Sequence, residues 1–166
     1  MKNHFSQPFK EALSLSREEA IRLQNDAIGT GHLFLALMKQ GGSNMARMFN
    51  QATIPIPDLQ KEIETVIRRE NNRAEITVAR GMIRKKRLFG LFTSRRPAGI
   101  CLSREAEKAI RESVALAAQM KSSEVGLKHL FLSILKDNKN FVADTLSGYG
   151  LSYQVVLSLL NLWQTI

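Results

Sequence analysis

One eleven-residue stretch occurs twice in this 166-residue chain, and the repetition limits the folds that the chain can adopt. Residues 29–39 read GTGHLFLALMK, and residues 126–136 read GLKHLFLSILK. In both copies a glycine turn leads into a run so dense in apolar residues that the predicted helix must be buried on most sides. We therefore interpret the chain as the product of an internal duplication.

The two copies fix an offset of 97 positions between equivalent residues, and this offset tests the duplication elsewhere in the chain. Small and apolar residues match at the same offset far outside the shared stretch. The matching pairs are Ser6 and Ser103, Ala12 and Ala109, Ser16 and Ser113, Ala20 and Ala117, Ala46 and Ala143, Phe49 and Leu146, Ile54 and Leu151, and Ile63 and Leu160. We infer a single domain over residues 1–166, with a first repeat at 4–70, a connector at 71–98 and a second repeat at 99–166.

Apolar and small residues at helical spacing predict four helices in each repeat. In the first repeat we expect a long helix that begins at the N-cap Ser6, the buried helix with Thr30 as its cap, a short helix at about 44–50 and a fourth helix at about 58–69. In the second repeat the same order starts at the cap Ser103 and ends with a helix at about 152–163. The predicted fold is all-α, with eight helices in two four-helix repeats about a pseudo-two-fold axis, because neither repeat alone buries its apolar stripe.

The formal net charge of +9 comes mainly from the connector, which holds eight basic residues against the single acidic Glu75. Six of the basic residues lie between positions 84 and 96: Arg84, Lys85, Lys86, Arg87, Arg95 and Arg96. No helical or strand period is sustained in residues 71–98, so we predict a mobile loop. Binding of nucleic acid or of an anionic membrane surface through this loop is an alternative hypothesis. We do not favour nucleic acid, because no nucleic-acid-binding fold is recognisable and charged loops are usually only solvated.

Other features exclude several classes of protein. No apolar run reaches the ~18 residues of a membrane span, and the N-terminus lacks the apolar core of a signal peptide. The single cysteine, Cys101, fits a reducing compartment, so we expect a cytoplasmic protein. His32 and His129 lack a second ligand one helical turn away, so we expect them to tie the preceding turn by hydrogen bonds and not to bind metal. We find no catalytic constellation and expect neither an enzyme nor a bound cofactor.

Two stretches of the first repeat carry a resemblance to a known family. Residues 18–23 read EEAIRL, and residues 28–37 read IGTGHLFLAL. Together with their repetition, they resemble the Clp N-terminal domain, the double four-helix module of Clp-family ATPases, and are most similar to its ClpC-type branch. The resemblance spans nearly the whole chain except residues 71–98. It implies a non-catalytic domain that captures substrate or adaptor proteins and passes them to an ATP-driven unfolding ring.

The resemblance also implies a pair of equivalent anion sites, one in each repeat. In the ClpC-type branch, a hydroxyl residue at the start of the first helix binds the phosphate of phosphoarginine, and an acidic residue faces the guanidinium. The hydroxyl positions correspond to Ser6 and Ser103, but the acidic positions are Gly31 and Lys128. We therefore expect phosphoarginine binding to be weak or absent, and we expect Lys128 to favour a plain anion or an acidic peptide.

Several functions remain open from the sequence. Our leading hypothesis is a substrate- or adaptor-binding domain of a Clp unfoldase, in which a groove between the repeats or the exposed ends of the two long helices binds a peptide. The alternatives are a free-standing Clp accessory protein and the N-domain of a type VI secretion Clp ATPase. The basic connector is a further candidate contact, either with an acidic partner or with the ATPase ring. The chain lacks a phosphate-binding loop motif, so ATP would bind only to further modules.

Overall fold

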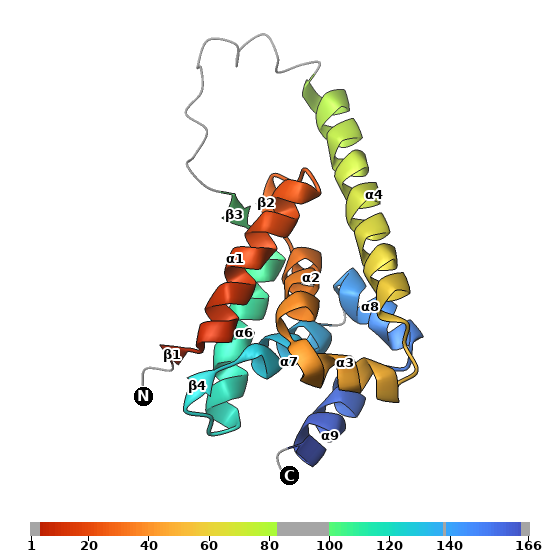
Figure 1. Ribbon diagram of the computed structural model, residues 1–166. Coiled ribbons are helices and arrows are strands. Elements are labelled where there is room, and N and C mark those ends of the chain that lie inside the picture. Colours follow the sequence, from red (N-terminus) through yellow and green to blue (C-terminus); the bar gives the residue numbers. More distant parts are fainter. Residues whose placement is uncertain (1–3, 83–99, 138, 164–166) are drawn as a thin grey trace.

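The computed structural model describes residues 4–82, 100–137 and 139–163, and these residues form eight helices (Figure 1). The first repeat contains α1 (Gln7–Arg22), α2 (Thr30–Gln40), α3 (Gly42–Gln51) and α4 (Ile56–Met82). The second repeat contains α6 (Arg104–Gln119), α7 (Leu127–Lys136), α8 (Phe141–Gly148) and α9 (Tyr153–Trp163). The prediction of an all-α fold with eight helices is confirmed.

Four strands of two residues each join the repeats, and helical periodicity did not predict them. They are β1 (His4–Phe5), β2 (Ala27–Ile28), β3 (Cys101–Leu102) and β4 (Glu124–Val125). β1 pairs in parallel with β4, and β2 pairs in parallel with β3. At the offset of 97, β1 is equivalent to β3 and β2 is equivalent to β4, so the two bridges are equivalent contacts between the repeats. A two-fold relation requires this. The bridges also make α1 and α6 run antiparallel (Figure 1).

Details of the backbone recur at the same offset. Gln24 and Lys121, just after α1 and α6, have φ angles of 59° and 51°, in the left-handed region that residues other than glycine seldom adopt. The residue that follows each donates its amide to a carbonyl five positions earlier, at 2.8 Å in the first repeat and 2.9 Å in the second. The two helix ends are therefore the same local structure, which supports the duplication.

Three phenylalanine rings lie where the repeats meet. Phe34 of α2 and Phe131 of α7 are equivalent residues, and their ring centroids are 5.9 Å apart in a stacked arrangement. Phe49 of α3 packs edge-on against both, at 6.4 Å and 6.5 Å. All three side chains are buried. The contact of a residue with its own equivalent places these rings at the pseudo-two-fold axis and makes the two halves share one core.

The helix α4 departs from the prediction at its C-terminal end. We expected it to stop near Arg69 and the connector to begin at residue 71, but α4 continues to Met82. No proline or glycine occurs between Pro57 and Gly81, so nothing in that sequence breaks a helix once the preceding turns have formed. Residues 71–82 are therefore helical, which corrects the boundary of the connector. The basic residues Arg84, Lys85, Lys86, Arg87, Arg95 and Arg96 lie outside the described residues.

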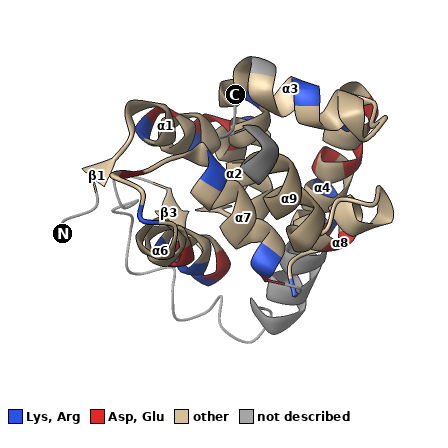
Figure 2. Cartoon of the chain, turned by 90° about the horizontal axis from the view of Figure 1, so that it is seen from below, with Lys and Arg blue, Asp and Glu red and all other residues tan. Residues whose placement is uncertain are grey.

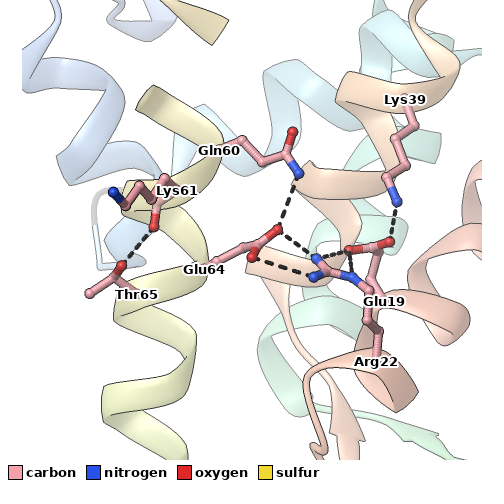
Figure 3. A network of polar contacts seen from close by, with 7 residues as sticks. All are labelled: Glu19, Arg22, Lys39, Gln60, Lys61, Glu64 and Thr65. Carbon is pink, nitrogen blue, oxygen red and sulfur yellow. Dashed lines mark hydrogen bonds and ion pairs between the residues drawn. The ribbon is translucent and has the colours of Figure 1, made fainter. Parts of the chain in front are cut away.

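A network of ion pairs connects α4 with α1 and α2 (Figure 3). Glu19 of α1 is buried and accepts hydrogen bonds from Arg22 and from Lys39 of α2. Arg22 also donates to Glu64 of α4 at 2.6 Å. Burial raises the pKa of Glu19, but the hydrogen bonds from Arg22 and Lys39 outweigh it and hold the pKa below its ordinary value. The network thus stays ionised at neutral pH and connects three helices.

Replacement of Phe34 by alanine is expected to destabilise the whole domain, because the ring is fully buried between the repeats. Loss of a buried phenylalanine costs about 3–5 kcal/mol. Urea unfolding should show this decrease in one cooperative transition. The matched control is Ile21→Ala, at a side chain that is 57% exposed, where we expect a change within ~0.5 kcal/mol. Equal effects of the two substitutions would contradict the shared core.

Candidate functional site

The reciprocal bridges bring the starts of four helices together in two pairs. The amide of Ser6, before α1, donates to the carbonyl of Val125, before α7, at 3.0 Å. The amide of Ser103, before α6, donates to the carbonyl of Ile28, before α2, at 2.9 Å. We call the first pair the α1–α7 junction (Ser6, Gly126 and Lys128) and the second the α6–α2 junction (Ser103, Gly29, Thr30 and Gly31). The predicted binding residues of the two repeats are thus combined crosswise.

The two serines cap their helices as predicted. The hydroxyl of Ser6 accepts a hydrogen bond from the amide of Phe9 at 3.3 Å, and that of Ser103 accepts one from Ala106 at 3.2 Å. The predicted cap Thr30 was wrong, because Gly29 is the N-cap and Thr30 is the first helical residue. Among the described residues, the buried hydroxyl of Thr30 has no hydrogen-bond partner. Its neighbour Gly29 takes the cap position without a capping side chain, and the histidine at the third helical position accepts a hydrogen bond from the amide of Gly29.

That histidine occurs in both junctions. The amide of Gly29 donates to Nδ1 of His32, and the amide of Gly126 donates to Nδ1 of His129, both at 2.9 Å. The interpretation that each histidine ties the preceding turn is confirmed. Burial lowers the pKa of both imidazoles to about 4. They are therefore neutral at pH 7, with the proton on Nε2 because Nδ1 accepts.

At the α6–α2 junction Gly31 is covered, and the pocket beside it is acidic. A Cβ atom on Gly31 would lie 2.7 Å from the ring of Phe141 and 2.8 Å from Ile67, so no side chain fits at this position. The pocket of about 190 Å³ beside Gly31 and Ser103 is also lined by Glu70 and Glu105. Glu105 and Glu107 lie in the first turn of α6 and offset the positive end of its helix dipole. This junction offers little attraction to an anion.

The α1–α7 junction has the opposite character. Neither α1 nor α7 has an acidic residue in its first turn, and Lys128 stands in the first turn of α7. The two helix starts are adjacent, since a Cβ on Gly126 would lie 3.9 Å from the hydroxyl of Ser6. Lys128 makes no ion pair with any described residue. Two positive helix ends and an unpaired ammonium group therefore gather at one place.

An apolar groove of about 230 Å³ opens beside Lys128, between the repeats. From the first repeat it is lined by the C-terminal end of α2 and by α3, and from the second by α7 and α9. The lining residues are Gly41, Asn44, Met45, Met48, Leu127, Lys128, Phe131 and Leu160. The sequence analysis predicted a groove between the repeats but did not identify Met45, Met48 or Leu160 as its lining. Apolar residues at helical spacing indicate a core and give no separate signal for a groove.

Divergence between the repeats explains why this groove is open. Asn44 in the groove is the equivalent of Phe141, and Lys128 is the equivalent of Gly31. At the α6–α2 junction the ring of Phe141 packs onto Gly31 and fills the space. At the α1–α7 junction a shorter, polar side chain stands in place of the ring. The same backbone arrangement therefore carries an acidic pocket beside a covered glycine on one side of the pseudo-two-fold axis and an apolar groove beside a lysine on the other.

The outer face of α9 is uncharged where the equivalent face of α4 is charged. Three exposed residues of α4 correspond to an apolar or neutral set in α9: Asp58, Lys61 and Glu62 correspond to Val155, Ser158 and Leu159. Val155 is 42% exposed. No charged residue occurs in Tyr153–Trp163, which lies at the end of the molecule seen in Figure 2. Packing within a repeat does not require apolar residues here, since α4 does without them.

Two observations concern all of the residues that the structure describes. They contain no group of three or more His, Cys, Asp or Glu side chains placed to hold a metal ion. Nor does any of their helices have the length and apolar character needed to span a membrane.

The fold and the two junctions define a class, the tandem four-helix repeat domains. Residues 4–84 match the family model described as "Clp repeat (R) N-terminal domain", and most of the chain is similar to known relatives. It is 26% identical over 165 residues to the negative regulator of genetic competence ClpC/MecB of Bacillus subtilis and equally to the chaperone protein ClpB of Oceanobacillus iheyensis. Each match covers 97% of this chain but 18% of the relative. The chain thus spans about a fifth of the length of these relatives.

Solved structures show the same fold. The Hsp104 N-terminal domain from Candida albicans matches with a TM-score of 0.67 at 15% identity, over 95% of this chain and 89% of that one. The N-terminal domain of ClpD from Arabidopsis thaliana matches with a TM-score of 0.64 at 12% identity, over 98% of this chain and 96% of that one. The resemblance to Clp N-terminal domains is confirmed. The assignment to the ClpC-type branch stays a prediction, because the ClpC and ClpB relatives are equally similar.

Acidification is expected to weaken the domain through its two capping histidines. Their pKa of about 4 in the folded state lies below the ordinary value of 6.5, so the unfolded chain binds protons first. The stabilisation is complete above about pH 6.5 and is lost as the pH falls towards 4. Urea unfolding at a series of pH values should show the free energy of unfolding decrease between pH 6.5 and pH 4.5. Glu19, whose pKa is lowered from 4.5 by folding, contributes to the loss only at lower pH. The variant His129→Gln should flatten the slope.

Substitution of Gly31 by alanine is expected to destabilise the domain, although alanine is the better helix former. The new methyl group would overlap Phe141 and Ile67, and such overpacking costs about 1–3 kcal/mol. Thermal unfolding measures the effect. The control is Gly148→Ala at the end of α8, where the Cβ position has open space around it, and this variant should be neutral or slightly stabilising. A neutral Gly31→Ala would show that the α6–α2 junction has room for a side chain.

Proposed function

We propose that this chain is the substrate- or adaptor-binding N-terminal domain of a Clp-family ATP-dependent unfoldase that acts in protein quality control. Two findings support the proposal. Residues 4–84 match the model of the Clp N-terminal domain family, and the similar relatives match nearly the whole chain but only about a fifth of their own length. A domain of this kind leaves ATP hydrolysis to other modules, so the chain itself is non-catalytic and holds no cofactor. We further propose a cytoplasmic location and contact with the Clp ATPase ring.

The observation that carries the proposal is the apolar groove between the repeats. Its lining combines two methionines with Leu127, Phe131 and Leu160. Methionine side chains are flexible and adapt to apolar surfaces of different shapes, which suits a site that takes more than one sequence. An amphipathic helix presents apolar residues at i, i+3, i+4 and i+7, and such a face fits a groove between helices. The uncharged outer face of α9 extends the surface that such a partner helix could contact.

Phosphoarginine is not the ligand that these junctions favour. Recognition of its guanidinium group needs a carboxylate at the position of Gly31 or Lys128. Gly31 is covered by Phe141 and Ile67, and Lys128 carries the wrong charge. Weak or absent phosphoarginine binding remains our proposal, and peptide binding at the groove replaces it.

The test of this function uses a fluorescein-labelled amphipathic peptide with leucines at i, i+3, i+4 and i+7. We expect the wild-type domain to bind it in fluorescence anisotropy. The variant Leu160→Gln should weaken binding by about tenfold, because it places an amide in the apolar groove. Leu160 is only half-buried, so the fold should survive, and thermal unfolding checks this.

The matched control is Ile21→Gln, which changes an exposed apolar residue at the far end of α1. It should leave the affinity unchanged. An equal loss in both variants, or no loss in either, would mean that the peptide binds elsewhere and that the groove is not the binding site.

A further inference from the structure

We propose that the groove selects segments in which a carboxylate stands beside apolar anchors, with Lys128 as the residue that reads the acidic group. The proposal rests on the function proposed above and names the chemistry of its partner. Lys128 combines two roles, since it lines the apolar groove and belongs to the α1–α7 junction. A partner that fills the groove must therefore pass beside its ammonium group.

No ion pair with a described residue neutralises the charge of Lys128. The first turns of both α1 and α7 lack acidic residues. The positive end of the α7 dipole adds to the field of Lys128 and does not offset it. A carboxylate of the partner would supply the counter-charge that the domain lacks.

The apolar part of the groove adjoins this charge directly. Leu127 precedes Lys128 in the chain, and Phe131 follows it by three positions, so all three residues are presented by one end of α7. A partner helix with an acidic residue one turn from its leucine or methionine anchors matches both features at once. A wholly apolar segment would fill the groove but leave Lys128 unpaired.

The structure also predicts how many such sites a domain has. The α6–α2 junction, which is the equivalent position, is filled by Phe141 over Gly31 and carries Glu70 and Glu105. The pocket of about 190 Å³ at this junction is lined by these two carboxylates and by no lysine or arginine, so it does not favour an acidic segment. We therefore expect a single acidic segment to bind per domain, although the fold is duplicated.

The experiment compares two labelled peptides that share the same leucine anchors and differ in one residue, glutamate or glutamine, one turn from them. At low salt the wild-type domain should bind the glutamate peptide about fivefold more tightly. This preference should shrink as salt is added. Lys128→Gln should remove the preference while retaining binding of the glutamine peptide. The control Lys61→Gln, at an exposed lysine on α4, should keep the preference, and calorimetry should give one site.

The outcomes separate this proposal from the proposed function. Equal affinity of the wild-type domain for both peptides, with Leu160→Gln still weakening binding, would overturn the role of Lys128 and leave the groove intact as a binding site. Failure of both peptides to bind would overturn the groove itself. Two equivalent sites in calorimetry, or self-association of the domain that Leu160→Gln abolishes, would overturn the assignment of this groove to an acidic segment.

Discussion

Contact between the two repeats is the constraint on which this structure depends. Each repeat exposes a stripe of apolar and small side chains that its own four helices do not cover, and the second repeat supplies the cover. At the centre Phe34 packs on its own equivalent, Phe131, with Phe49 against both. At the edges two parallel bridges connect each repeat to the other in the same way. Burial of this seam fixes the antiparallel course of α1 and α6, and it brings the starts of four helices into two junctions.

Those junctions show how a symmetric fold yields an asymmetric surface. The backbone needs only a few features to be retained in both repeats: the N-cap serines, the capping histidines and the left-handed residue after the first helix. Side chains that do not form the seam are free to differ. Two such differences, Asn44 against Phe141 and Lys128 against Gly31, help to give one junction an apolar groove beside a positive charge and the other a pocket lined by carboxylates.

The sequence predicted most of this fold because the duplication supplies an internal comparison. Eight helices, the serine caps and the role of both histidines followed from residues that match at one offset. The boundary of α4 was wrong because residues 71–82 lack an apolar period, yet they also lack a helix breaker, and continuation of an existing helix needs only the absence of one. The cap of α2 was wrong because Thr30 is a good capping residue in isolation, whereas the bond that fixes the turn comes from His32. The two-residue bridges are too short for any periodicity to reveal.

The candidate site was less predictable than the fold, for a physical reason. Apolar residues that line a groove and apolar residues that fill a core have the same helical spacing, so Met45 and Met48 gave no separate signal. What distinguishes them is whether a large side chain fills the space beside them, which helical spacing does not reveal. Here position 44 lacks a ring beside the groove, while the equivalent ring of Phe141 covers Gly31 at the other junction. In a duplicated domain such a site is found by comparing the repeats with each other, because the position where one repeat has lost a filling side chain is where a partner can supply it.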